Sequence, residues 1–344
     1  MWRARLGERL NHKQVLTDDE RREYVETALN HRVIPTTPHV KPYSSDKNVT
    51  PEKDEALLRE IRRTHDRKPS LITTKKAEAK YDETGVLDHV DGVKHHGGMK
   101  GSNDFEDERL GVLIGSRHFG DAFVKKWGAY LGDAVETPDR TDEQNRGVGL
   151  SYGETGDKIL RHMREHETLQ GLMRFGRDGH GAVIYCHTNT LPSWYPTETE
   201  TPEEDAVIRP RSEAERDVIQ ELRRRGEGST AELAENVDVT KRRVLQILNR
   251  LKKRGVVDVT DEGRGYVWHD DGLHRVNDAG DVSLDAVELD ELPDEEVHEI
   301  SRNSSYTTSF VKTDDSHASK AGDVDPDASW TSRRAETGGE PPPD

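Results

Sequence analysis

The sequence predicts an α/β protein with a parallel sheet domain, a smaller α+β domain and an acidic, largely disordered tail. Three observations predict this class. Short apolar segments alternate with helical segments between residues 48 and 196, which is typical of parallel sheets covered by helices. Three helical segments and two short strands follow over residues 211–270. Residues 271–344 are strongly acidic and show no apolar period.

The composition limits the size of any core. Only 31% of the 344 residues are apolar and 35% are charged, so a compact core requires that part of the chain stays unstructured. Asp and Glu outnumber Lys and Arg by 68 to 51, and Arg (33) outnumbers Lys (18). Such an acidic, lysine-poor surface favours a halophilic protein from a salt-rich cytoplasm. An acidic protein from an ordinary cell is the alternative.

Cysteine usage and hydropathy restrict the compartment. Cys186 is the single cysteine and lies in an apolar run, where a small core residue is expected rather than a nucleophile. No apolar stretch approaches the roughly 20 residues needed to cross a bilayer, and the first residues lack a signal-peptide core. We expect a soluble, cytoplasmic protein with no membrane partner and no metal site.

Residues 1–47 are expected to form a polar segment with one helix, which begins near Asp18. A proline-broken connector over residues 33–51 follows it. The parallel sheet domain then spans residues 48–196. Its first helix begins at Thr50 with proline in the first turn, and its apolar stripe consists of Leu57, Leu58 and Ile61.

Three short strands are expected in this domain, in residues 69–74, 109–116 and 182–188. Ligands of such sheets lie at the carboxyl ends of the strands. The loop from Ser116 to Asp121 follows the second strand and offers a hydroxyl, a glycine and an acid to a ligand.

A glycine-rich loop, His95–Phe105, precedes the second strand. Its backbone amides could approach a phosphate or a nucleic-acid backbone, with Lys100 as a point charge. A plain loop is the alternative. The order of its glycines and lysine differs from that of a nucleotide-binding P-loop.

The stretch Glu167–Pro192 carries an amide and two guanidinium groups before the last strand. The offsets between Gln170, Arg174 and Arg177 would place all three on one face of a helix. Guanidinium forks suit a polyphosphate.

An acidic linker over residues 197–210 separates the second domain, residues 211–270. Helices are expected from Ser212 to Arg225, after Ser229 and after Thr240, followed by two strands joined by a short turn. Three helices and a β-hairpin in this order predict a winged helix-turn-helix, whose third helix enters the major groove of DNA.

The third helix reverses the sign of the chain's charge. Residues 241–254 hold seven cations and no acids in a chain of net charge −17, which is the footprint of a DNA-binding surface. A module for protein contacts is the alternative. The residues expected to contact DNA here are Thr240, Lys241, Arg242, Arg243 and Arg250.

Two motifs of the sheet domain resemble those of superfamily-2 helicases. QGLMRFGR, residues 170–177, resembles the last conserved motif of their second RecA-like domain, and RLGVLIGSRHFGD, residues 109–121, resembles the motif before it. The combination looks like the carboxyl-terminal part of helicase-like proteins found on haloarchaeal plasmids and viruses, over roughly residues 50–196. The resemblance implies a RecA-like sheet domain.

The resemblance also implies roles. Arg174 and Arg177 would be arginine fingers on the γ-phosphate of ATP, and Gln170 would contact the nucleotide. Ser116, with Gly120 and Asp121, would couple nucleic acid to the nucleotide pocket. Met173 stands where the family has glycine, and no P-loop is present in the chain, so ATP and magnesium would require a separately encoded P-loop domain.

Two functions remain open at this point. The first is a truncated or split helicase subunit that acts on DNA with such a partner and is inactive as an ATPase alone. The alternative is a winged-helix transcriptional regulator that uses the RecA-like domain for dimerisation or ligand binding and forms a homodimer through its winged helix. A complete ATP-driven enzyme is disfavoured because the phosphate-binding motifs are missing.

Overall fold

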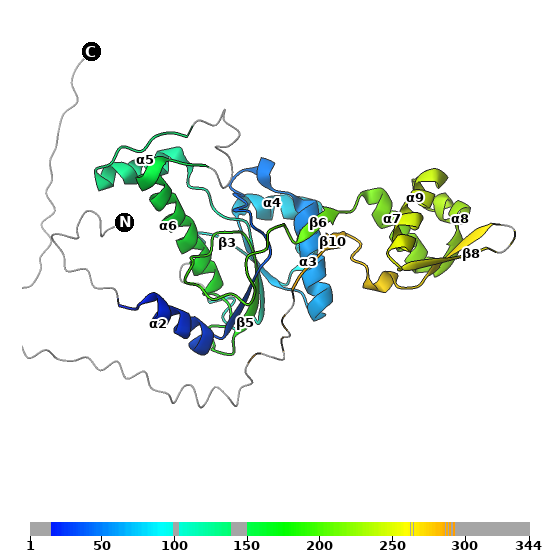
Figure 1. Cartoon of the computed structure of the whole chain (residues 1–344), viewed down its shortest axis with the longest axis horizontal. Coiled ribbons are helices and arrows are strands. Elements are labelled where there is room, and N and C mark those ends of the chain that lie inside the picture. The colour runs from blue at the N-terminus through cyan, green and yellow to red at the C-terminus, as the bar shows by residue number, and fades with distance from the viewer. Residues whose placement is uncertain are drawn as a thin grey trace, which may run out of the picture. The chain divides into compact units, whose positions relative to one another are not determined.

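The computed structural model describes residues 15–98, 103–138, 150–261, 263, 265–285, 287, 289 and 292. All of them belong to the first of two compact units, Met1–Asn303. That unit contains a parallel sheet with helices on both faces, and a small helical domain with its own sheet (Figure 1).

The main sheet has five strands in the order β1-β5-β4-β2-β3, and every neighbouring pair is parallel. The strands are β1 (His31–Pro35), β2 (Ser70–Thr73), β3 (Val93–His95), β4 (Leu110–Ile114) and β5 (Ala182–His187). The three strands expected from sequence are therefore confirmed as β2, β4 and β5.

Helices cover the two faces of the sheet in two groups. Alternate residues of each central strand face opposite sides, so Val112 lies in the core on one side and Leu113 in the core on the other. On the first side lie α3 (Pro51–His65) and α4 (Lys75–Thr84). On the second lie α6 (Gly153–Leu172) and the π-helical turn Tyr24–Ala28, which continues the short helix α2 (Asp18–Glu23). The expected stripe on α3 is buried.

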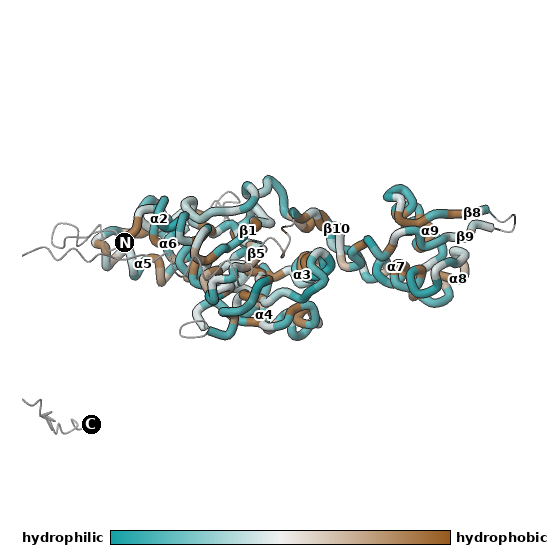
Figure 2. The backbone as a smooth tube through the Cα atoms, turned by 90° about the horizontal axis from the view of Figure 1, so that it is seen from below, coloured by the Kyte–Doolittle hydropathy of each residue, from teal (hydrophilic) through white to brown (hydrophobic). Residues whose placement is uncertain are grey.

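The helix α5 (Gly120–Leu131) packs against α6 in a small separate cluster around Tyr152 and Ile159. Cys186 is fully buried, and burial raises the pKa of its thiol to about 12. This confirms its expected role as a core residue. Figure 2 shows short hydrophobic stretches separated by long hydrophilic ones, in line with the low apolar fraction.

Two strands of the main sheet were not expected from sequence, and because of the first, β1, the sheet domain begins before the expected boundary at residue 48. β1 begins two residues before the segment expected as a connector, residues 33–51, and its buried residues Val33 and Ile34 lie within that segment. It is an edge strand that ends in Pro35, a position where the missing N–H of proline costs no ladder bond. β3 directly precedes the expected glycine-rich loop and shares only His95 with it.

The second domain has the expected order of three helices and two strands. It contains α7 (Glu213–Arg225), β7 (Glu227–Ser229), α8 (Thr230–Glu235), α9 (Lys241–Lys253), β8 (Val257–Asp261) and β9 (Tyr266–Asp270). Ser229 and Thr240 cap α8 and α9 through side-chain hydrogen bonds to backbone N–H groups. β7 was not expected; it joins β9 and β8 in a three-stranded sheet.

Residues expected as linker and tail form a two-stranded strap, which consists of β6 (Val207–Pro210) and β10 (Gly280–Val282). Asn277 Nδ2 donates to the carbonyl of Ala56 on α3 at 2.8 Å, and a Cβ on Gly280 would meet the Cβ of Ala56 at 2.6 Å. The strap therefore packs closely on the sheet domain. Residues from 293 onward lie outside the described part of the chain.

Candidate nucleic-acid interface

The helix α9 separates its apolar and polar residues onto opposite faces. Val244, Ile247, Leu248 and Leu251 are buried in the core of the winged helix. At 100° per residue, the side chains farthest from these four recur at i, i+4, i+7 and i+11. We call them the outward row; its members are Arg242, Gln246, Asn249 and Lys253, and all four are exposed.

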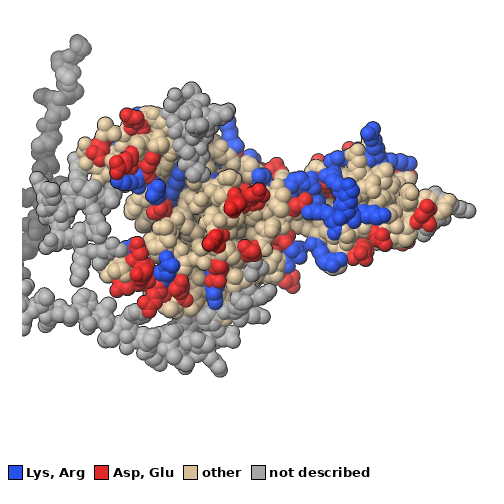
Figure 3. Space-filling model, viewed as in Figure 1, with Lys and Arg blue, Asp and Glu red and all other residues tan. Residues whose placement is uncertain are grey.

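The cations of α9 fall into two classes. Arg250 Nη1 lies 2.9 Å from Glu215 Oε1, and Arg254 Nη1 lies 2.5 Å from Asp281 Oδ1 on the strap. Among the described residues, no carboxylate lies within 4 Å of Arg242 or Lys253. Figure 3 shows basic side chains gathered over the winged-helix part of the visible face.

The buried carboxylate of Glu215 pairs with Arg250, whose own side chain stays 44% exposed. Burial by itself raises the pKa of Glu215, but hydrogen bonds from Arg209 and from the backbone of Ser212 lower that pKa below its ordinary value. Arg209 Nη1 lies 2.9 Å from the same carboxylate. Arg250 is thus already paired within the chain, and its expected contact with DNA stays a prediction.

Thr240 has a structural task at the N-terminus of α9. Its hydroxyl oxygen accepts a hydrogen bond from the backbone N–H of Arg243, which is the standard N-cap arrangement. Lys241, Arg242 and Arg243 occupy the first turn and are exposed.

The hairpin β8–β9 forms the wing. Tyr266 at the start of β9 is 60% exposed, and Leu245 on α9 is 40% exposed, so both offer apolar contacts on this surface. Asp258 and Asp261 are also exposed on the wing and would be repelled by phosphate. Arg264 lies outside the described residues.

The arginine-rich stretch of the sheet domain does not form the expected helix face. α6 ends at Leu172, so Gln170 lies in the helix while Arg174 and Arg177 lie in the segment 173–181 beyond it, which we call the arginine turn. Gln170 Nε2 is 2.6 Å from His166 Nε2, and Arg177 Nη1 donates to Asn103 Oδ1 at 2.9 Å.

Packing explains the glycines of the arginine turn. Gly176 has φ +55°, and a Cβ there would lie 2.6 Å from the carbonyl carbon of Gly181. The backbone carbonyl of Phe175 is bonded to His31 Nε2 at 3.0 Å, while His31 Nδ1 lies 2.8 Å from the hydroxyl of Tyr195. Burial lowers the pKa of His31 to about 4, so the imidazole is neutral at pH 7.

The structure places the two groups of predicted site residues at opposite edges of the sheet. Arg174 and Arg177 precede β5, whereas Ser116, Gly120 and Asp121 follow β4. Because β4 and β5 are parallel, the first group lies at the amino ends of the strands and the second at the carboxyl ends. About 16 Å of strand separates the two edges.

The carboxyl edge of β4 is occupied by the segment expected as a connector. Ser116 is buried, its N–H donates to Lys41 O at 2.8 Å, and its hydroxyl donates to Val40 O at 2.7 Å. Asp121 Oδ1 accepts from the hydroxyl of Tyr152 at 2.6 Å. Ser116 therefore binds the connector through its N–H and its hydroxyl, and its hydroxyl does not face a ligand.

Lys100 lies outside the described residues. Gln246, Asn249 and Lys253 were missed as interface residues, although the 3.6-residue period of the apolar positions in α9 contained the signal. No helix among the described residues is long and apolar enough to cross a membrane.

The comparison with protein families identifies the same region. A family model described as winged helix-turn-helix DNA-binding matches residues 211–258. A solved structure of Bordetella bronchiseptica BpsR, whose DNA binding is regulated by 6-hydroxynicotinic acid, is 22% identical over 17% of this chain and 44% of that chain, with a TM-score of 0.17. No curated protein matches. Residues 211–258 thus form a winged helix-turn-helix DNA-binding domain, attached to an α/β sheet domain.

Proposed function

We propose that this chain is a transcriptional regulator that binds duplex DNA by placing α9 in the major groove. The observation that carries the proposal is the outward row, with two cations and two amides exposed opposite the buried apolar face. The major groove is wide enough for one α-helix, and the second helix of a helix-turn-helix unit, here α9, enters it.

The outward row has the chemistry of base recognition. Arginine forms bidentate hydrogen bonds with guanine, and the amides of glutamine and asparagine pair with adenine. Arg242, Gln246 and Asn249 would therefore read bases, and Lys253, at the other end of the row, would contact phosphate. Leu245 would add an apolar contact of the kind that thymine methyl groups accept.

Charge reversal in the first turn of α9 tests DNA binding. Arg242→Glu with Arg243→Glu should weaken binding to a fluorescent duplex of the preferred sequence by at least 100-fold, about 3 kcal/mol, because two attractive charges become repulsive. The matched control reverses Lys75 and Lys76, two adjacent exposed cations in the first turn of α4. Fluorescence anisotropy measures both, with the sequence found beforehand by selection from random duplexes.

The same assay separates exposed cations from paired ones. Arg250→Gln should leave the affinity within about threefold of the original, because Glu215 already holds this guanidinium. Equal affinity of the original and the α9 reversal variant would overturn the proposal. The regulator would bind as a homodimer, which predicts two half-sites separated by about one helical turn of DNA, and footprinting measures that spacing.

A second candidate is a helicase subunit that acts with a separate P-loop protein. It is supported by the resemblance of residues 170–177 to a helicase motif and by the exposure of Arg177 on the arginine turn. Arg174 and Arg177 would then reach ATP and magnesium held by the partner. Adding the chain to a P-loop protein encoded beside it should stimulate ATP hydrolysis, and Arg177→Ala should remove the stimulation. Hydrolysis unaffected by the chain would exclude this function.

A further inference from the structure

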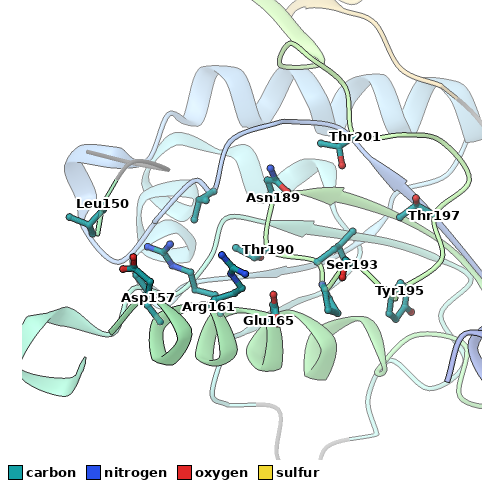
Figure 4. A pocket seen from close by; sticks show the side chains of 15 residues that line it. Leu150, Asp157, Arg161, Glu165, Asn189, Thr190, Ser193, Tyr195, Thr197 and Thr201 are labelled. Atoms are coloured by element: carbon teal, nitrogen blue, oxygen red, sulfur yellow. The ribbon is translucent and has the colours of Figure 1, made fainter. Parts of the chain in front are cut away.

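A pocket of about 600 Å³ lies between α6 and the segment that follows β5. Asp157, Arg161, Arg164 and Glu165 line it from the helix, and residues 189–193 line it from the opposite side. Figure 4 shows Arg161 extending from α6 toward Asn189 and Thr190. Because residues 189–193 follow the last residue of β5, the pocket lies at the carboxyl side of the strands, where ligands of parallel sheets bind.

The positive charges of Arg161 and Arg164 are poorly compensated by neighbouring acids. Among the described residues, no carboxylate oxygen lies within 4 Å of either guanidinium. Within the described parts of the chain, Arg164 Nε is buried without a hydrogen-bond partner, and Nη2 is hydrogen-bonded to His118 Nδ1 alone, at 3.2 Å. Burial lowers the pKa of Arg164, which means that desolvation of its charge is not offset by a neighbouring anion. A buried, unpaired cation is costly unless something else pairs with it.

The acids in the pocket do not fill this role. Asp157 is already used, because its carboxylate accepts from the backbone N–H of Tyr152 at 2.6 Å and from the hydroxyl of Ser151 at 2.7 Å. Burial raises the pKa of Glu165, and Arg161 partly offsets that rise. Glu165 therefore remains an acceptor for hydroxyl or amine groups of a ligand.

Neutral hydrogen-bonding groups make up much of the rest of the lining. They belong to Asn189, Thr190, Ser193, Thr197 and Thr201. The volume lies within the 300–1,000 Å³ typical of small-molecule sites. Two guanidinium forks one turn apart favour phosphate over a single carboxylate, and the surrounding hydroxyl and amide groups favour a ligand with sugar hydroxyls.

We propose that this pocket binds a sugar phosphate of mononucleotide size, with the phosphate on Arg161 and Arg164 and the sugar hydroxyls on Glu165 and the segment after β5. The site is separate from the arginine turn, because neither Arg174 nor Arg177 lines the pocket. It also goes beyond the proposed DNA-binding function: the ligand binds in the absence of DNA and without α9.

Calorimetric titration of the full chain tests the site. The probes are ribose 5-phosphate, the four ribonucleoside 5′-monophosphates, inorganic phosphate and a single-stranded hexanucleotide. At least one sugar phosphate should bind one to one, and Arg161→Gln and Arg164→Gln should each weaken it by about tenfold or more, the effect of losing a charged hydrogen bond. Lys158→Gln is the matched control, because Lys158 lies on the same helix, is exposed and is outside the pocket.

If Arg164→Gln fails to fold, Arg164→Lys replaces it as the test variant. It keeps the charge but loses the fork, so it should weaken binding less than Arg161→Gln does. No binding of any sugar phosphate at about 1 mM, or equal loss in the Lys158→Gln control, would overturn the proposal. Tighter binding of the hexanucleotide than of every monophosphate would also overturn it, because the site would then belong to a nucleic-acid strand.

Discussion

The outward row of α9 and the arginine turn after α6 both carry exposed basic side chains, yet the structure holds them differently. In α9 the cations of the outward row stand on a regular helix, exposed and away from described carboxylates. In the arginine turn, the backbone is held by His31 and by the close approach of Gly176 and Gly181. The first region is built around its exposed side chains, and the second around a compact backbone.

This difference shows what an arginine-rich pattern means in each setting. On a helix with a buried apolar face, the 3.6-residue period fixes which side chains face solvent. In a turn, each side chain follows from local φ and ψ angles and from distant residues. The function assigned to α9 therefore rests on geometry, whereas that assigned to the arginine turn rests on resemblance.

Acidification should have the largest effect on this comparison, because it should destabilise the sheet domain, which holds the arginine turn, more than the winged helix, which holds α9. Burial lowers the pKa of His31 and of His96 to about 4, and it lowers that of His187 well below its ordinary value. A depressed histidine pKa stabilises the fold above pH 6.5, and this stability is lost as the pH falls toward 4. Lowering a histidine pKa from its ordinary value to about 4 corresponds to roughly 3 kcal/mol, and all three histidines belong to the sheet domain.

Asp54 acts in the opposite direction, because burial raises its pKa to about 6. Its contribution is present below pH 4 and is lost as the pH rises through 6, so it offsets about one of the three histidines. Hydrogen exchange between pH 7 and 4.5, corrected for the intrinsic pH dependence of the amide rates, should therefore show lower protection in β4 and β5 while the protection of α9 changes little. His31→Gln should reduce the pH dependence. An equal loss of hydrogen-exchange protection in α9 would contradict the expected difference between the sheet domain and the winged helix.

Gly176→Ala is expected to have the next largest effect. The new Cβ would lie 2.6 Å from the backbone of Gly181 at φ +55°, and overlap of this kind usually costs about 1–3 kcal/mol on top of the strain. Gly255 after α9 is the matched control, since it has φ +67° and a Cβ added there would meet no described atom within 4 Å. Its alanine variant should lose only the strain, about 1 kcal/mol.

Urea unfolding measures both glycine variants. Equal losses of unfolding free energy would mean that the arginine turn has room for a side chain, in which case its glycines would have a role other than packing. DNA binding should stay unchanged in Gly176→Ala, because the substitution lies outside the winged helix.

The sequence alone predicted the regular elements of the sheet domain and of the winged helix. β2, β4 and β5 are continuous apolar runs, and α9 has a cap at Thr240 and a clear apolar period. β1 was missed because prolines and short length hide an edge strand. The strap was missed because β10 lies in acidic sequence and is stabilised by distant contacts, such as that between Asn277 and Ala56.

The same limit applies to the candidate sites: a local period could be predicted from sequence, whereas contacts between distant residues could not. The outward row was present in the periodicity of α9, but the pairing of Arg250 with Glu215 and of Arg254 with Asp281 involves residues 27 to 35 positions away in sequence. The pocket with Arg161 and Arg164 depends on how α6 faces the segment after β5. No local pattern contains such information, because it arises from the tertiary packing of separate elements.

The smallest predicted effect concerns Thr240, which sequence assigned to DNA contact and which the structure shows as the N-cap of α9. Thr240→Ala should lower the free energy of unfolding by about 1 kcal/mol, because the N–H of Arg243 loses its acceptor. The affinity of the folded protein for DNA should change by less than about twofold. Thermal unfolding and fluorescence anisotropy measure the two quantities separately.

Thr240→Asp distinguishes capping from contact with DNA. Aspartate caps at least as well as threonine, and its charge is favourable at a helix N-terminus, so stability should be kept or slightly raised. The same charge beside Lys241 and Arg242 repels phosphate, so DNA affinity should fall about tenfold. If Thr240→Ala instead weakens DNA binding tenfold at unchanged stability, the hydroxyl itself contacts DNA, and the first turn of α9 binds DNA through its cap as well as through its cations.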